Sequence, residues 1–243
     1  VAVVTGAGRG IGRATARSLG AWGAGVVAVD IDGEAVEATV ADITAARGQA
    51  EAAVADVCSE EQVVALFRDV RTKHGRVDIL VNVVGGGRPA GVMEIAADEW
   101  DRMFAFNVRS CFLCSREAAR HMAGTGGGRI INVASIAGQR TSVLQGAHYS
   151  ASKAAVIGLT RHMARELGPL GINVNAIAPG VTATERVEGQ MTPESRQALI
   201  SRIPLRRLAT PEDQAGVILF LASSLASYVT GVTIDVSGGI LLA

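Results

Sequence analysis

The chain has 243 residues, of which 49% are hydrophobic and 19% charged, so it can bury a large core and is not a disordered protein. Its 23 lysines and arginines balance 23 aspartates and glutamates, and no basic run stands out, which excludes the electrostatic footprint of a nucleic-acid-binding protein. No apolar stretch reaches the roughly 18 residues needed to span a bilayer. We therefore expect a cytoplasmic protein without a membrane anchor, formed by one domain over residues 1–243.

Short apolar segments alternate with longer helical patterns along the whole chain. The apolar segments are continuous, which indicates strands buried on both faces, and the alternation indicates parallel pairing with helical crossovers. The sequence therefore predicts an α/β protein with a doubly wound Rossmann fold, in which helices cover both faces of a seven-stranded parallel sheet. The predicted strands are residues 1–5, 25–30, 50–54, 79–84, 129–134, 173–178 and 232–236.

A glycine-rich turn follows the first predicted strand. The segment 6–12 has the sequence Gly-Ala-Gly-Arg-Gly-Ile-Gly and precedes a helix that we predict to begin near Arg13. A helix N-terminus offers free N–H groups and a positive dipole to a pyrophosphate, and glycines let the main chain approach it closely. Because Gly6, Gly10 and Gly12 do not have the G-x-G-x-x-G spacing, a purely structural turn remains the alternative.

The second predicted strand ends at Asp30. An acidic residue at this position accepts hydrogen bonds from the ribose hydroxyls of an adenosine and repels a 2'-phosphate. The sequence therefore favours NAD over NADP, although Arg9 in the glycine turn could partly compensate for the acid. The alternative is that Asp30 is only a turn residue before Gly33.

Three cysteines, Cys58, Cys111 and Cys114, do not form an even disulfide framework. The last two lie in mid-helix without a second pair of ligands, so we expect them to pack on an apolar face and predict no metal site.

Tyr149 and Lys153 lie four residues apart at the start of a helical pattern, and therefore share one face of that helix. A lysine cation beside a phenol favours the phenolate, so we expect Lys153 to lower the pKa of Tyr149 toward a value useful near neutral pH.

Residues 181–207 interrupt the alternation of strands and helices, and contain Pro193 and Pro204. Irregular insertions at the carboxyl ends of parallel strands are where ligands bind in such sheets. We predict that this segment, called the lid below, covers the substrate; the alternative is a surface excursion.

Together these motifs resemble the short-chain dehydrogenase/reductase family over essentially the whole chain. The matching elements are the glycine turn from Thr5 to Gly12, Asp30, Asp56-Val57 after the third strand, Asn107, Ser135, Tyr149 with Lys153, and Pro179-Gly180 followed by Thr184.

The resemblance implies a role for each matching residue. Tyr149 would be the proton acid or base, Ser135 would orient the substrate oxygen, Lys153 would hold the nicotinamide ribose, and Asn107 would support a proton-relay water. Asp56 and Val57 would edge the adenine. The implied cofactor residues are Gly6, Arg9, Gly10, Ile11, Gly12, Asp30, Asp56, Val57, Asn82, Tyr149, Lys153, Pro179, Gly180, Thr182 and Thr184.

The chain departs from the family pattern in two places. Asn82-Val83-Val84-Gly85 stands where the family has Asn-Asn-Ala-Gly, which puts the side-chain bracing of the fourth strand in doubt. His148 is not part of the family motif, and either a substrate contact or a structural role is open for it.

The resemblance predicts an oxidoreductase that transfers a hydride between NAD(H) and a secondary alcohol or ketone, such as a 3-hydroxyacyl compound or a cyclic alcohol. One alternative is a 3-oxoacyl-ACP reductase using NADPH; Arg129 matches one of two basic residues that dock the carrier protein, but Leu170 occupies the other position. Another alternative is a catalytically silent NAD-binding sensor. Arg88 or Arg140 could receive an anionic group of the substrate.

The resemblance also suggests a homotetramer, with contacts formed by helices near residues 99–123 and 149–167 and by the last strand. The second of these helices carries apolar residues on more than one side, as expected for burial against both sheet and partner. These residues are Val156, Ile157, Leu159, Met163 and Leu167.

Overall fold

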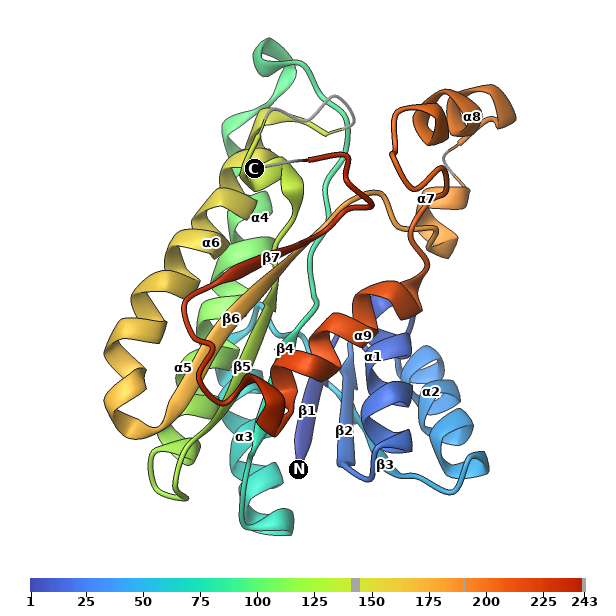
Figure 1. Ribbon diagram of the computed structural model, residues 1–243. Helices are drawn as coiled ribbons and strands as arrows, with labels where there is room; N and C mark the ends of the chain where they lie inside the picture. Colours follow the sequence, from blue (N-terminus) through green and yellow to red (C-terminus); the bar gives the residue numbers. More distant parts are fainter. Residues whose placement is uncertain (141–144, 190, 242–243) are drawn as a thin grey trace.

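The computed structural model describes residues 1–140, 145–189 and 191–241 (Figure 1). In this part of the chain seven strands form one parallel sheet in the order β3-β2-β1-β4-β5-β6-β7, so the predicted doubly wound fold is confirmed. The strands are β1 Ala2–Thr5, β2 Gly25–Asp30, β3 Gln49–Val54, β4 Ile79–Asn82, β5 Gly128–Val133, β6 Ile172–Pro179 and β7 Thr233–Val236.

Helices cover both faces of the sheet. One face carries α1 (Gly10–Ala21), α2 (Gly33–Ala45) and α9 (Pro211–Ala222), and the other carries α3 (Glu60–His74), α5 (Ser110–Met122) and α6 (Ala147–Leu167) (Figure 1). The other helices are α4 (Ala97–Phe104), α7 (Glu185–Glu188) and α8 (Pro193–Ser201). Short helical turns span Val92–Glu94, Ala105–Arg109, Ile136–Gly138, Gly168–Leu170 and Ser224–Ala226. No helix in these described ranges is long and apolar enough to cross a membrane.

The strands have continuous apolar sequences because helices bury both faces of the sheet. Successive strand residues point to opposite sides, so Val3 packs among residues of α3, α5 and α6, whereas Val4 packs among residues of α1, α2 and α9. Both side chains are fully buried. Two hydrophobic layers, one on each side of the sheet, therefore stabilise the fold.

Two predicted boundaries differ from the structure for identifiable reasons. The fourth strand ends at Asn82 instead of residue 84, because the Val83 N–H donates to Thr5 Oγ1 at 3.1 Å instead of to a neighbouring strand. Helix α1 begins at Gly10 instead of near Arg13. The Arg13 N–H donates to Arg9 O at 3.1 Å, so Arg13 already ends the first helical turn.

The lid is more regular than the sequence suggested. It contains α7 and α8, and Pro193 occupies the first turn of α8, where its missing N–H costs no hydrogen bond. Leu199 and Ile203 are buried in a small apolar cluster with Leu208. The segment interrupts the alternation of strands and helices, as predicted, and two short helices make it partly regular.

Cys111 and Cys114 are both buried, at 4% and 0% exposure, which confirms that they pack on an apolar face. They lie inside the continuous helical run formed by α4, the turn Ala105–Arg109 and α5, as predicted. Burial raises the pKa of Cys111 to about 11, so the thiol stays protonated near neutral pH.

Candidate active site

The predicted site residues gather at the carboxyl edge of the sheet. β1 lies between β2 and β4, and the connections that leave β1 and β4 cover opposite faces, which opens a crevice beyond the strand ends. Asp30, Asn82, Val133 and Pro179 end their strands at this edge.

The N-terminus of α1 faces this edge. Arg9 occupies its N-cap position without a side-chain cap, whereas Asp32 and Ser59 cap α2 and α3. The first N–H groups of α1 therefore have no side-chain partner at the cap. A Cβ on Gly12 would overlap the Gly6 carbonyl oxygen, so the close packing of helix and turn requires glycine there. This arrangement fits a pyrophosphate.

Asp30 is held rigidly at the end of β2. Its carboxylate accepts hydrogen bonds from the Gly8 N–H at 2.9 Å and the Asp32 N–H at 3.1 Å. A carboxylate has about four acceptor positions, so two ribose hydroxyls can still be accommodated. Arg9 forms an ion pair with Asp32 at 3.0 Å, which engages the cation that could have compensated for Asp30.

Two predicted cofactor residues turn their side chains into the protein. Val57 is 4% exposed and packs in the core, so only its main chain can face an adenine. Asn82 donates to Ser115 Oγ and to Asn132 Oδ1, both at 2.9 Å, and thereby ties β4 to α5 and β5. The bracing of the fourth strand is therefore present despite the departure at Val83 and Val84.

The remaining members of the predicted set lie along the crevice. Asp56 follows β3 and accepts a hydrogen bond from the Cys58 N–H at 2.9 Å. Thr182 is buried beside Gln214, and Thr184 caps α7. A Cβ on Gly10 would lie 3.0 Å from the Thr184 methyl group, so the start of the lid packs against the glycine turn.

Asn107 lies in a π-helical turn, Ala105–Arg109, that joins α4 and α5 into one continuous helical run. Its Oδ1 accepts from the Gly86 N–H at 2.9 Å and its Nδ2 donates to Gly86 O at 3.0 Å. This side chain therefore clamps the loop after β4. Single π-turns occur frequently at functional sites, but no sequence pattern indicated this one.

Ser135, Tyr149 and Lys153 converge from β5 and α6. Ser135 follows β5 and hydrogen-bonds Tyr149, which lies in the first turn of α6 and is partly exposed. Lys153 is 3% exposed, and its Nζ donates to Val133 O at 2.8 Å. The same Nζ lies 5.9 Å from the centroid of the Tyr149 ring.

The expectation that Lys153 lowers the pKa of Tyr149 is wrong for this arrangement. Burial among protein atoms raises the pKa of Tyr149, and the groups that partly offset this are the Ser135 hydrogen bond and the Arg186 cation. Burial also lowers the pKa of Lys153, to about 8. The Lys153 ammonium donates its hydrogen bond to Val133 O, and Lys153 is not among the groups that lower the pKa of Tyr149.

Three residues whose roles the sequence left undecided form contacts within the protein. His148 is fully buried with its Nε2 3.0 Å from Glu99 Oε1, which favours a structural role. Arg88 forms an ion pair with the same Glu99 at 2.5 Å, and Arg140 donates to Ile240 O at 2.7 Å. Arg88 is therefore engaged by an acidic partner, whereas Arg140 is held by a main-chain carbonyl. Sequence reasoning missed Arg186, whose Nη2 reaches from the lid to Gly87 O at 2.6 Å.

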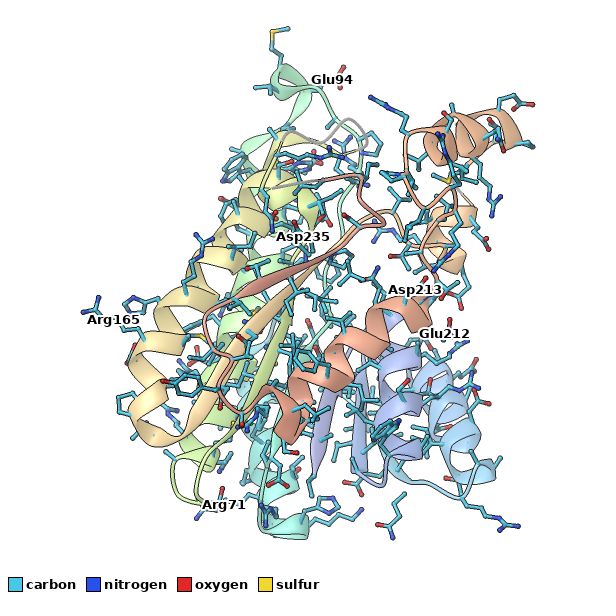
Figure 2. The ribbon with its side chains drawn as sticks, viewed as in Figure 1. Arg71, Glu94, Arg165, Glu212, Asp213 and Asp235 are labelled. Atoms are coloured by element: carbon cyan, nitrogen blue, oxygen red, sulfur yellow. The ribbon has the colours of Figure 1, made fainter. Side chains whose placement is uncertain are left out.

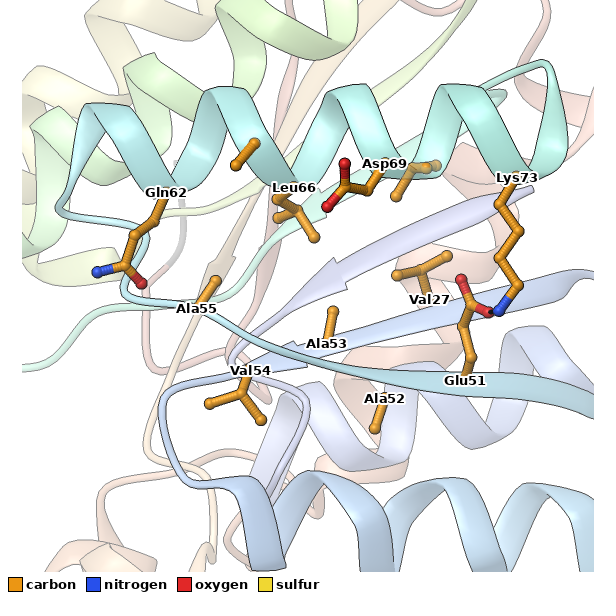
Figure 3. A pocket seen from close by; sticks show the side chains of 12 residues that line it. Val27, Glu51, Ala52, Ala53, Val54, Ala55, Gln62, Leu66, Asp69 and Lys73 are labelled. Carbon is orange, nitrogen blue, oxygen red and sulfur yellow. Dashed lines mark hydrogen bonds and ion pairs between the residues drawn. The ribbon is translucent and has the colours of Figure 1, made fainter.

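A separate groove with a volume of about 460 Å³ lies at the β3 edge of the sheet (Figure 3). Alanines of β3 and apolar residues of α3 line it, and Lys73 forms an ion pair with Glu51 at its rim. None of the predicted site residues lines this groove. It is therefore distinct from the crevice that holds Tyr149.

Comparisons with known proteins agree with this geometry. Residues 6–241 match a family model described as enoyl-(acyl carrier protein) reductase. A 3-oxoacyl-[acyl-carrier-protein] reductase of Synechocystis sp. is 40% identical over 244 residues, covering 100% of this chain and 97% of the relative.

Two solved structures share the fold. A 7α-hydroxysteroid dehydrogenase complexed with NADH and 7-oxo glycochenodeoxycholic acid has a TM-score of 0.94 and 40% identity, covering 98% of this chain and 92% of the other. A putative gluconate dehydrogenase from Agrobacterium tumefaciens has a TM-score of 0.96 and 34% identity, covering 100% and 96%. The chain therefore belongs to the short-chain dehydrogenase/reductase family, and it is an oxidoreductase that acts on secondary alcohols or ketones.

Proposed function

We propose that the protein transfers a hydride reversibly between NAD(H) and a secondary alcohol or ketone bound against Ser135 and Tyr149. The observation that supports this most directly is the convergence of these two hydroxyls with Lys153 beside the uncapped N-terminus of α1. The bound nicotinamide supplies or accepts the hydride. The protein's own residues handle the oxygen and its proton.

Reduction of a carbonyl creates an alkoxide that must be stabilised and protonated. Ser135 donates a hydrogen bond to the substrate oxygen, and Tyr149 delivers its proton to the same atom. The raised pKa of Tyr149 keeps the phenol protonated and therefore ready to act as an acid. In the oxidative direction the phenolate accepts the proton instead. Lys153 holds the nicotinamide ribose, and Asn107 keeps the loop after β4 in place through Gly86.

NAD is the proposed cofactor because Asp30 is held at the end of β2 and Arg9 is paired with Asp32. Asp30→Asn removes the charge that repels a 2'-phosphate. We expect the ratio of kcat/KM for NAD to kcat/KM for NADP to fall at least about tenfold, the effect of one charged contact. Asp42→Asn, on the exposed side of α2, is the control. An unchanged ratio in Asp30→Asn would contradict the assignment of this carboxylate.

The alternative of a 3-oxoacyl-ACP reductase using NADPH is supported by the Synechocystis relative. Arg129 adds no support to it. This arginine lies near the amino end of β5, about 13 Å along the strand from Val133, and its Nη1 donates to Asn173 Oδ1 at 2.8 Å. A carrier protein that delivers its acyl group to Tyr149 would dock at the opposite edge of the sheet.

The test of the proposed function is the initial rate of nicotinamide absorbance change, with NAD and NADP in parallel. The substrate panel comprises linear secondary alcohols, cyclic alcohols and 3-hydroxyacyl thioesters. Turnover with NAD on one class would support the proposal, and turnover of thioesters with NADP alone would favour the acyl-ACP reductase. Measurable NAD binding without turnover across the panel would favour the silent sensor.

We also propose that the protein is a homotetramer. Some of the apolar residues of α6 that suggested a partner are already buried by the chain itself: Val156, Ile157 and Met163 are at most 8% exposed. The outer side of this helix carries charge in its second half, where Arg165 points away from the helix (Figure 2), and small exposed residues, Ala154 and Gly158, before it. The aromatic side chains of the α4 to α5 region remain open to solvent instead: Trp100, Phe106 and Phe112 are 39%, 40% and 42% exposed.

Gel filtration with light scattering should give about four times the 25.0 kDa chain mass if closed symmetric assembly occurs. Phe112→Glu should shift the mass toward smaller species, because burying a carboxylate in an apolar contact is costly. Trp22→Glu, which changes an exposed aromatic residue after α1, is the control. Elution of the unmodified protein at the mass of one chain would exclude the tetramer.

A further inference from the structure

Arg186 of α7 reaches from the lid to the loop that follows β4. Its Nη2 donates to Gly87 O at 2.6 Å, and its Nη1 lies against Gly86. The Tyr149 ring stands against the same loop, since a Cβ on Gly87 would lie 2.6 Å from the ring atom Cδ2 and 2.7 Å from Cγ. Two side chains from different elements, a cation and the proposed proton acid, therefore meet on one glycine.

This contact limits the distance between the two groups. Both touch the atoms of Gly87, so standard bond lengths place the guanidinium nitrogen no more than about 10 Å from the near end of the ring. Within this distance the Arg186 cation favours the phenolate, and it partly offsets the raised pKa of Tyr149.

Arg186 also differs from three ion-paired arginines of this part of the molecule. Arg13 pairs with Glu185, Arg88 with Glu99, and Arg207 with Asp213. Arg186 has no acidic partner among the residues that the structure describes, and its side chain is exposed. A guanidinium carries five N–H donors in a fork that matches a carboxylate. The hydrogen bond to Gly87 O uses one of them.

We propose that Arg186 binds a carboxylate of the substrate, so that the protein acts on small hydroxy acids or oxo acids. This assignment rests on the proposed function of Tyr149 and Ser135. The phenol oxygen lies at the far end of the ring, so the same bond lengths place it no more than about 14 Å from the guanidinium nitrogen. After a hydrogen bond of about 3 Å at each end, the remaining space accommodates a chain of at most about six carbon atoms. The substrate therefore carries its reacting carbon within about six bonds of the acid group.

The test compares acids with their neutral esters in the complete, NADH-loaded protein. The probes are acetoacetate and levulinate, each beside its methyl ester, and the measured quantity is the ratio of kcat/KM for acid to kcat/KM for ester. Arg186→Gln should lower this ratio by tenfold to a hundredfold, mainly through KM. Arg186→Lys should lower it less, because the charge remains but the fork is lost. Arg202→Gln, an exposed arginine of the same lid, is the control and should leave the ratio unchanged.

Calorimetric titration of the same probes into the NADH-loaded protein separates this assignment from the proposed function. Arg186-dependent binding of the acids without turnover by the unmodified protein would overturn the hydride-transfer proposal and keep the carboxylate site. If Arg186→Gln lowers kcat/KM equally for acid and ester, the ratio is unchanged and the carboxylate site is overturned. Absence of acid binding to the unmodified protein would also overturn it. A weaker affinity of Arg186→Gln for NADH with an unchanged ratio would also overturn it, since Arg186 would then serve the cofactor.

Discussion

Tyr149→Phe should lower kcat by about a hundredfold to ten-thousandfold, the usual contribution of a positioned general acid. The change removes one hydroxyl and leaves the ring against Gly87, so the fold and the crevice should stay intact. The hydroxyl is also the group that hydrogen-bonds Ser135, and its loss leaves the substrate oxygen without a proton donor. NADH binding should persist, because most of the implied cofactor residues, including the glycine turn, Asp30 and Lys153, are unchanged.

The measurements are kcat at saturating substrate and the dissociation constant of NADH from fluorescence titration. Tyr228→Phe provides a matched control, because Tyr228 is the second of the two tyrosines in the chain and is fully exposed. Turnover by Tyr149→Phe within a few-fold of the unmodified rate would exclude Tyr149 as the acid. Loss of NADH binding together with turnover would instead place the residue mainly in the cofactor site.

Lys153→Met should abolish most activity and, at the same time, stabilise the folded protein near neutral pH. The Lys153 cation is buried with one carbonyl partner, Val133 O, and burial lowers its pKa from 10.5 to about 8. Burying a charge with so few partners costs free energy. The linear methionine side chain can fill the same space without that cost.

The pH dependence follows from the direction of this shift. Between about pH 8 and pH 10.5 the unfolded chain holds the lysine proton while the folded chain has released it, so the contribution of Lys153 to stability rises with pH. The full change is about 3 kcal/mol. Below pH 8 both states are protonated and the destabilisation by Lys153 is constant.

Urea unfolding at intervals from pH 7 to pH 10 measures this effect as a difference between proteins. The stability advantage of Lys153→Met over the unmodified protein should be largest at pH 7 to 8 and should shrink as the pH rises toward 10. Lys73→Met, which removes an exposed lysine of α3, controls for loss of a titratable charge. A difference that does not vary with pH would refute the lowered pKa of Lys153.

Much of this protein was predictable from local patterns. Continuous apolar segments indicated strands buried on both faces, and Val3 and Val4 indeed enter opposite hydrophobic layers. The turn at Gly12 and the acid at Asp30 could be found because each depends on a few residues next to a strand end. The same holds for the four-residue spacing of Tyr149 and Lys153, which a helix converts into a shared face.

The sequence by itself therefore determined the fold class, the family and the set of residues at the carboxyl edge of the sheet. Tertiary structure alone decided how those residues act on one another. Burial raises the pKa of Tyr149. Packing between distant segments places the Lys153 ammonium against Val133 O and the Asn82 side chain in the core. The same packing brings Arg186 of the lid to Gly87, a contact between positions 99 residues apart. Desolvation and long-range contacts depend on which distant segments meet, and periodicity within one segment carries no information about that.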